Sequence, residues 1–242
     1  MPAMSGLIII PAYNEEGAIG HFLEELMADL PPDARILVVD DGSKDNTYEV
    51  VKAHGIPCCR LPCNLGYTGA LKTGLLYGLE LGVAWMAFID GDGQHRPCDL
   101  KSMVHRFKSG HLDLLVGSRW LEHRPDQSSA KGRRLGMEFF SWLTLKLTGH
   151  RFTDTTNGLK LMNPKVAKEL VARNFGDFHA ETLIYLHDRG YRIAEHPIVV
   201  RARETGSSMY SFKDVVFYPL KNLILIGIFK LNSWTLAQVE RK

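Results

Sequence analysis

The sequence predicts an α/β fold in which a mostly parallel sheet is flanked by helices on both faces. Apolar runs of strand length, such as Leu7 to Pro11 and Trp85 to Ile89, are typical of strands that are covered on both sides. Segments with apolar residues at helical spacing lie between them. Strand and helix alternate at intervals of roughly 15 to 30 residues through the first half of the chain, which predicts right-handed βαβ units.

Start and stop signals delimit the elements of this first half. Pro31-Pro32 ends the first helix, Asp45 can cap the second, and Gly55 closes it. Pro97 and Gly110 enclose a further helix in the same way. We expect strands over residues 7–11, 35–39, 56–61, 85–89 and 112–116, and helices over 19–30, 45–55, 70–81 and 97–110.

The alternation loosens from Gly132 onward. We expect helices over 135–147, from Asn163-Pro164, and over 180–188, with strands over 158–162 and 193–200. No repeat and no Pro/Ser-rich linker divides the chain, so residues 1–212 are expected to form one domain and residues 213–242 a C-terminal tail.

Composition limits the classes of function. A formal net charge of +2 over 242 residues predicts no strong attraction to nucleic acid. The ten histidines lack the i, i+4 spacing of a zinc helix, and we interpret the four cysteines as reduced thiols of a cytosolic protein. No basic segment precedes an apolar core at the N-terminus, so we expect a cytoplasmic protein without a signal peptide.

Polar residues follow four of the expected strands, at the carboxyl edge where ligands bind in parallel sheets. Asp90 and Asp92 are the most informative pair, because two carboxylates at the end of a buried strand can approach one hard divalent cation. Gln94 can add an amide oxygen. The alternative is a turn held by side-chain-to-backbone hydrogen bonds.

Asp40 and Asp41 place more negative charge at the same edge, which costs electrostatic energy unless donors or a cation offset it. Ribose hydroxyls and base N–H groups are suitable donors, whereas the alternative is a turn that leads into a helix. The Asn64–Gly69 loop also allows two interpretations: it is a plain turn and helix cap, or it is a loop that lets a ligand approach the backbone.

The chain resembles the family 2 glycosyltransferases of the GT-A fold, a Rossmann-like α/β fold, and in particular the dolichyl-phosphate mannose synthase and polyprenyl-phosphate glycosyltransferase group. The stretches that carry the resemblance run from about residue 7 to residue 208. They are IIIPAYNEE (8–16), VVDDGSKDNT (38–47), NLGYTGALKTGL (64–75), FIDGDGQHRP (88–97), VGSR (116–119), DTTNGLKLMN (154–163), Glu181 and RARETGSS (201–208).

The resemblance implies a role for each matching residue. The nucleoside pocket would be lined by Pro11, Tyr13, Glu15 and Asp40, with Asp41 near the ribose or diphosphate and Glu181 a further substrate-site residue. Mg²⁺ or Mn²⁺ on the donor diphosphate would be held by Asp90, Asp92 and Gln94. The arginines that meet donor and acceptor phosphates would be Arg119, Arg133 and Arg203, with Arg134 an equal candidate for the second; the alternative for the Arg133-Arg134 pair is an ordinary surface position.

A phosphate acceptor agrees with these residue types. A phosphate monoester is mostly dianionic at neutral pH, with a second pKa of about 6, so it needs cations rather than a general base. We therefore expect metal-dependent, inverting transfer of a hexose from a GDP- or UDP-linked sugar to a polyprenyl phosphate. The alternatives are a sugar hydroxyl as acceptor, with Asp154 as base rather than a structural residue, and a non-catalytic partner subunit.

The C-terminal tail contains an apolar stretch, VVFYPLKNLILIGIFKL (215–231), that is expected to form an apolar or amphipathic helix. It is shorter than the roughly 20 residues of a spanning helix and contains a proline and two interior polar residues. We expect the tail to bind the cytoplasmic face of a membrane, or a small membrane-protein partner, without crossing the bilayer. The alternative is a helix buried in the core or in a homodimer.

Overall fold

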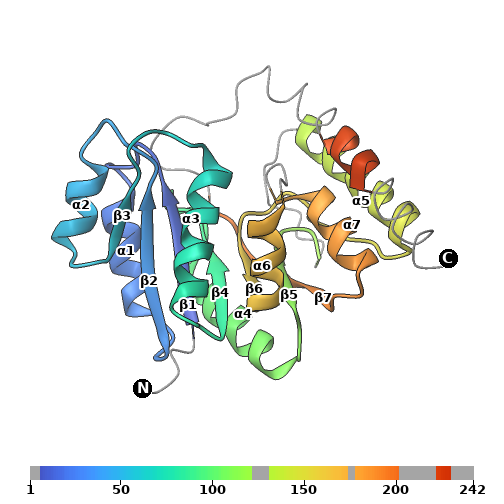
Figure 1. Cartoon of the computed structure of the whole chain (residues 1–242), viewed down its shortest axis with the longest axis horizontal. Coiled ribbons are helices and arrows are strands. Elements are labelled where there is room, and N and C mark those ends of the chain that lie inside the picture. Colours follow the sequence, from blue (N-terminus) through green and yellow to red (C-terminus); the bar gives the residue numbers. More distant parts are fainter. Residues whose placement is uncertain (1–5, 122–130, 174–177, 202–221, 230–242) are drawn as a thin grey trace.

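The computed structural model describes residues 6–121, 131–173, 178–201 and 222–229, with only the backbone for residues 131–135. Its centre is a seven-stranded sheet of order β3-β2-β1-β4-β6-β5-β7 (Figure 1). The elements along the chain are β1 (Gly6–Ala12), α1 (Ile19–Ala28), β2 (Ala34–Asp40), α2 (Thr47–Ala53), β3 (Cys58–Arg60), α3 (Tyr67–Glu80), β4 (Trp85–Phe88), α4 (Pro97–Ser109), β5 (Leu114–Ser118), α5 (Lys131–Thr148), β6 (Lys160–Met162), α6 (Pro164–Ala172), α7 (Ala180–Asp188) and β7 (Ile193–Pro197).

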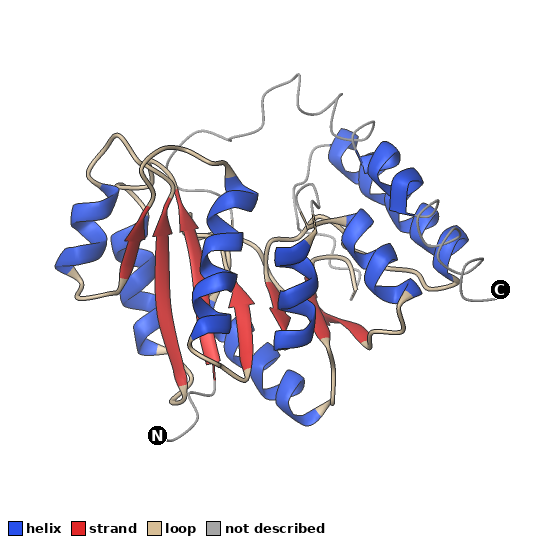
Figure 2. Ribbon diagram, in the orientation of Figure 1, coloured by secondary structure: helices blue, strands red, loops and turns tan. Residues whose placement is uncertain are grey.

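The sheet is mostly parallel, as the sequence predicts. β1 pairs in parallel with both β2 and β4, β2 with β3, and β5 with β7. β6 is antiparallel to β4 and to β5, between which it lies. Helices cover both faces of this sheet (Figure 2), so the α/β architecture is confirmed.

The period of two along β1 divides the interior into two cores. Ile8 and Ile10 pack with residues of α1, α2 and α4 on one face, whereas Leu7 and Ile9 pack with residues of α3, α6 and α7 on the other. All four side chains are almost fully buried. A strand that is covered on both faces accounts for the uninterrupted apolar run in the sequence.

Each strand and helix expected between residues 7 and 200 is present, with small differences at the ends. β3 and β7 are shorter than predicted, and α2 begins at Thr47 after Asn46 at the N-cap. Asp45 still serves the start of that helix, because its carboxylate accepts the Thr47 N–H at 3.0 Å. All four cysteines are free thiols in this structure.

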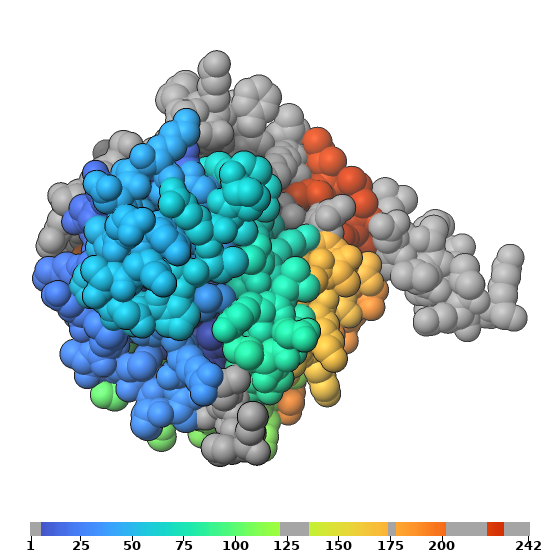
Figure 3. All heavy atoms as spheres, turned by 60° about the vertical axis from the view of Figure 1, so that its left-hand side comes forward, coloured from blue at the N-terminus to red at the C-terminus, as the bar shows by residue number. Residues whose placement is uncertain are grey.

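A third, smaller cluster joins α5, α7 and the helical residues 222–229. Phe140 from α5, Ala180 and Ile184 from α7, and Ile226 are its buried members. The helix of residues 222–229, red in Figure 1, lies beside α5. In Figure 3 the N-terminal elements, coloured blue to teal, form one continuous surface, and the red residues appear at the upper right.

Only residues 222–229 of the expected C-terminal helix are described, and they are helical. The rest of the predicted tail lies outside the described residues. None of the helices in the described ranges has the length and apolar character needed to cross a bilayer.

Candidate active site

The expected polar clusters meet at one edge of the sheet. From β1 the chain adds β2 and β3 on one side of the sheet and then crosses to add β4 on the other side. The loops that follow β1, β2 and β4 therefore leave from neighbouring strand ends. Ala12 pairs with Asp40 at the end of β1 and β2, and Ile9 pairs with Phe88, two residues before Asp90. Such a switch point is the usual ligand crevice of an open α/β sheet.

The loop after β1 is tied to the loop after β2. Asn14 has a positive φ of 54°, its N–H donates to Ser43 Oγ at 3.0 Å, and its Oδ1 accepts the Lys44 N–H at 2.8 Å. These bonds fix the turn from which a nucleoside pocket would be built. The residues expected in that pocket lie at this strand end and are half-buried: Pro11, Tyr13 and Glu15.

Asp40 is fully buried at the end of β2. Its Oδ1 accepts the Ser43 N–H at 2.9 Å, and its Oδ2 lies 3.2 Å from Arg60 Nε. The Arg60 side chain is about half exposed (46%). The Asp-Asp-Gly-Ser turn of the alternative interpretation is therefore present, and any contact of Asp40 with a nucleoside would be made in addition to it.

Asp41 is also buried, and it supports the start of α3. Its two carboxylate oxygens accept the N–H groups of Leu65 and Gly66 at 2.7 and 2.8 Å. Burial raises the pKa of this carboxyl more than the two hydrogen bonds lower it. Gly66, directly before α3, has a φ of 81°, which favours glycine, and the two hydrogen bonds of Asp41 hold the loop in front of the helix.

Asp90 lies beyond the end of β4 with about a third (32%) of its side chain exposed. Tyr67 donates its hydroxyl to Oδ1 at 3.0 Å, and His95 Nε2 lies 3.5 Å from Oδ2. Burial raises the pKa of Asp90, but His95, the Tyr67 hydroxyl and the charge of Lys160 together lower it below its usual value. Asp90 is consequently ionised at neutral pH, as a metal ligand must be.

Asp92 and Gln94 form the turn that follows. Asp92 Oδ1 accepts the Gln94 N–H at 3.0 Å, and Gln94 donates its amide nitrogen to the Arg201 carbonyl at 3.1 Å. Among the described residues, no group of three or more acidic, histidine or cysteine side chains is placed so that it could hold a metal ion. Two neighbouring carboxylates still fit Mg²⁺ or Mn²⁺, because such ions usually keep places for water and substrate phosphates.

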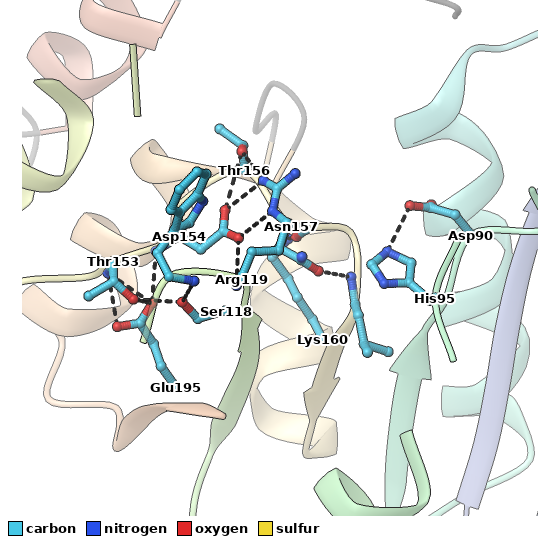
Figure 4. A network of polar contacts seen from close by, with 12 residues as sticks. Asp90, His95, Ser118, Arg119, Thr153, Asp154, Thr156, Asn157, Lys160 and Glu195 are labelled. Carbon is cyan, nitrogen blue, oxygen red and sulfur yellow. Dashed lines mark hydrogen bonds and ion pairs between the residues drawn. The ribbon is translucent and has the colours of Figure 1, made fainter. Parts of the chain in front are cut away.

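Arg119, one residue beyond β5, is bound to Asp154 (Figure 4). Arg119 Nε and Nη2 donate to the two carboxylate oxygens at 2.6 and 2.9 Å, the Arg119 N–H donates at 3.1 Å, and Nη2 also donates to Thr156 Oγ1 at 3.0 Å. The Asp154 side chain is completely buried and that of Arg119 is 18% exposed. This bidentate pair fixes the guanidinium at the carboxyl edge of the sheet.

Glu195 on β7 holds the backbone at Thr153 and Asp154. Its carboxylate accepts the N–H groups of Thr153 and Asp154 at 2.8 to 2.9 Å. Burial raises the pKa of Asp154, but the charge and hydrogen bonds of Arg119 lower it by more, so the pKa of this carboxyl is below its usual value. Asp154 is therefore placed as a partner of Arg119.

Lys160 is a site residue that the sequence interpretation did not single out. It is 3% exposed, donates to the Asn157 carbonyl, and lies between the Arg119–Asp154 pair and Asp90 in Figure 4. Burial lowers its pKa to about 8, against the opposing effect of nearby carboxylates. The signal for Lys160 in the sequence is a single lysine within an otherwise apolar strand. His95 and Tyr67 lie in the stretches 88–97 and 64–75, but the sequence predicts no role for either side chain.

The remaining predicted residues are placed incompletely. Glu181 is fully buried in the first turn of α7, where its Oε1 accepts the His179 N–H at 3.2 Å. Arg133 and Arg134 lie in the first turn of α5, but their side chains are outside the described part of the chain. Arg203 lies outside it as well.

An open α/β sheet with carboxylates at its switch point, and with Arg119 and Lys160 at the strands beyond β4, is typical of an α/β protein that binds a charged ligand. Comparison with known sequences specifies the family. The family model described as glycosyl transferase family 2 matches residues 7–170, and the chain belongs to this family. The resemblance noted in the sequence is thereby confirmed, and the protein is a glycosyltransferase.

Related sequences cover most of the chain. A Methanocaldococcus jannaschii protein of uncharacterised function is 30% identical over 225 residues, which are 92% of each chain. The UDP-N-acetylglucosamine–dolichyl-phosphate N-acetylglucosaminyltransferase of Methanococcus voltae is 29% identical, over 79% of this chain and 83% of its own. The undecaprenyl-phosphate mannosyltransferase of Micrococcus luteus is 27% identical, over 86% of this chain and 88% of its own.

Solved structures show the same fold. Glucosyl-3-phosphoglycerate synthase from Mycobacterium tuberculosis in complex with phosphoglyceric acid superposes with a TM-score of 0.72 at 18% identity, covering 93% of this chain and 80% of the other. At this identity the similarity concerns the fold, and it confirms the GT-A prediction.

Proposed function

We propose that the protein transfers a hexose, with inversion, from a nucleoside diphosphate sugar to a polyprenyl phosphate. The observation that carries this proposal is the buried Arg119–Asp154 pair. A hydroxyl acceptor needs a base, whereas a phosphate acceptor is already anionic and needs a cation. Asp154 accepts three N–H groups of Arg119 and has a lowered pKa, so it is a poor base, while a fixed guanidinium suits a phosphate.

The donor side of the site is assigned to the loops after β1, β2 and β4. In this proposal the nucleoside contacts the strand ends near Tyr13 and Asp40, and the diphosphate extends toward Asp90 and Asp92. Mg²⁺ or Mn²⁺, held by Asp90, Asp92 and the amide oxygen of Gln94, would supply positive charge against the departing nucleoside diphosphate.

The side chains of this chain perform the remaining tasks. Tyr67 and His95 hold the Asp90 carboxylate in an ionised, oriented state. Arg119 orients the acceptor phosphate for attack at the anomeric carbon from the face opposite the leaving group, which gives inversion. Arg203 and one of Arg133 and Arg134 are assigned to donor and acceptor phosphates, as the family resemblance implies.

Two relatives support the acceptor. The Methanococcus voltae enzyme acts on dolichyl phosphate and the Micrococcus luteus enzyme on undecaprenyl phosphate, according to their names. A sugar-hydroxyl acceptor would require Asp154 as base, and the contacts of Asp154 with Arg119 disfavour it. A non-catalytic subunit would be expected to have lost the paired carboxylates, which are present here.

A polyprenyl acceptor requires the site to come to a membrane surface, where the tail of residues 213–242 is assigned to bind. Large apolar side chains are exposed on two helices that lie side by side in Figure 1. They are Phe139, Trp142 and Leu145 on α5, and Leu223, Ile224 and Ile228 on the helix of residues 222–229. Such side chains suit the interfacial zone of a bilayer. A small membrane protein or a second copy of the chain is the alternative partner for this surface.

Sugar transfer with radiolabelled donors tests the proposal. The full chain is incubated with labelled UDP- or GDP-hexose, Mn²⁺ and a polyprenyl phosphate in detergent, and the organic phase is counted. We expect label in the organic phase that EDTA abolishes and Mn²⁺ restores. Label that enters only water-soluble glycans, or that is indifferent to EDTA, contradicts the proposal.

A further inference from the structure

Lys160 occupies a position that no part of the proposed chemistry requires. It is the first residue of β6, and it pairs with Phe88 on β4 and with Val116 on β5. The first of these strands leads to Asp90 and the second to Arg119. Lys160 therefore lies between the strand that leads to Asp90, on the donor side of the site, and the strand that leads to Arg119, on the acceptor side.

Its side chain supports the turn formed by residues 154–158. Lys160 Nζ donates to the Asn157 carbonyl oxygen from within the protein, at a fully buried position. Asp154, at the start of this turn, carries the three hydrogen bonds from Arg119. The orientation of the guanidinium thus depends on the backbone that Lys160 holds.

The other end of the turn lies against Asp90. An ideal Cβ built on Gly158 would be only 2.4 Å from Asp90 Oδ2 and 3.0 Å from its Oδ1. Asp90 therefore packs directly on the backbone of Gly158, and it can do so because glycine has no side chain there. One turn touches the carboxylate on the donor side and the arginine on the acceptor side.

We propose that Lys160 is a positioning residue for sugar transfer: by holding the turn of residues 154–158, it sets the relative positions of Arg119 and Asp90. The inference rests on the proposed roles of Arg119 and Asp90. It adds that the two sides are not independent, because a single hydrogen-bonded turn connects them.

The energetics agree with a functional rather than a purely stabilising role. Burial lowers the pKa of Lys160 to about 8, and the nearby carboxylates of Asp90, Asp154 and Glu181 only partly oppose that shift. The removal of this ammonium group from water costs stability, and the neighbouring carboxylates offset that cost only in part. Residues retained at a cost to stability are typical of active sites.

The test compares Lys160→Met with wild type and with Lys165→Met, which removes an exposed lysine on α6 and controls for the lost charge. We expect Lys160→Met to be less stable than wild type but to remain folded and to unfold cooperatively at the assay temperature, and to bind nucleotide without metal within threefold of wild type. Its kcat should fall at least thirtyfold and its KM for the acceptor should rise. Lys165→Met should match wild type. A folded Lys160→Met protein with both kinetic constants within threefold of wild type overturns the inference.

A double-mutant comparison separates positioning from a general structural defect. Asp154→Asn weakens the attachment of Arg119 to the same turn, so combining it with Lys160→Met should cost little more than the larger single effect. Losses that multiply show that the two residues act separately, and they contradict the proposal.

Gly158→Ala provides a second route if Lys160→Met does not fold, because it disturbs the opposite end of the turn. We expect at least tenfold weaker Mn²⁺ binding in the presence of nucleoside diphosphate, measured by electron paramagnetic resonance, and a higher acceptor KM. Weaker Mn²⁺ binding with an unchanged acceptor KM would show that the turn does not connect the two sides.

Failure of the proposed function is distinguishable from failure of this inference. If wild type uses a different acceptor or needs no metal, the proposed function is wrong, and the Lys160 variants are scored with the acceptor that wild type uses. If wild type transfers the sugar to polyprenyl phosphate as proposed, but Lys160→Met lacks the expected decrease in kcat and increase in acceptor KM, only the positioning role is wrong.

Discussion

Replacement of Arg119 by lysine tests the cation on which the acceptor assignment depends. Arg119→Lys keeps the charge, but one ammonium group cannot reproduce the Nε and Nη2 contacts with Asp154 together with the Nη2 contact with Thr156. The lysine is expected to pair with Asp154 and to lose the phosphate contact that Arg119 can make through Nη1, the nitrogen that its bonds to Asp154 and Thr156 do not use. Hydrogen bonds to charged groups contribute about 1.5–3 kcal/mol each.

A loss of about 2–3 kcal/mol at the acceptor phosphate corresponds to a decrease in kcat/KM of roughly 30- to 150-fold. The assay is initial-rate transfer to polyprenyl phosphate, with donor affinity measured separately by calorimetry. Donor affinity should stay within about threefold of wild type, because the donor contacts lie on other strands. Arg192→Lys is the matched control, since Arg192 pairs with Asp113 away from the site, with Nε 3.3 Å from the carboxylate. If donor binding falls as far as transfer does, Arg119 serves the donor and its assignment is wrong.

Three further predictions follow from the same structure. Asp92→Asn should abolish metal-dependent diphosphate binding and lower turnover by about 10²- to 10³-fold; near-normal, metal-stimulated transfer by this variant would remove Asp92 from the site. Deletion of residues 213–242 should leave nucleotide binding intact but reduce liposome flotation and transfer to long-chain acceptors, and a truncated protein that floats as well as the full chain would contradict the assignment of the tail. The pKa of Lys160 falls from 10.5 to about 8 on folding, so between these values the unfolded chain binds the proton more tightly and the contribution of Lys160 to stability rises with pH. From pH 7 to pH 10 the free energy of unfolding of wild type should therefore gain about 2–3 kcal/mol relative to Lys160→Met in urea titrations, and a difference that is constant with pH would refute the shift.

The sequence predicted the strands well because their burial leaves a direct mark. The apolar run of β1 and the alternation with amphipathic helices follow from a sheet covered on both faces. The antiparallel direction of β6 was not predicted. β6 has only three residues, and whether such a segment runs parallel or antiparallel depends on the path of the preceding chain rather than on its own residues.

The candidate site was predicted in its carboxylates but not in their partners. Asp90 and Asp92 stand in a recognisable spacing, whereas Asp154 contacts an arginine 35 residues earlier in the chain. No local pattern encodes such a distant contact, so the sequence left Asp154 open between a base and a structural residue. Lys160 was missed for a related reason, because its burial depends on β4 and β5, the two strands that flank β6.

The most direct measurement is a competition between a polyprenyl phosphate and the matching polyprenol, present together at equal concentration with labelled donor and Mn²⁺. Because Arg119 supplies a cation and Asp154 is a poor base, we predict that essentially all lipid-linked label is a sugar phosphate diester, seen by mass spectrometry. The same diester should fall in Arg119→Lys without a gain of label on polyprenol. Efficient glycosylation of polyprenol, or of a glycan hydroxyl added in its place, would show that a base operates in this site and would contradict the phosphate acceptor.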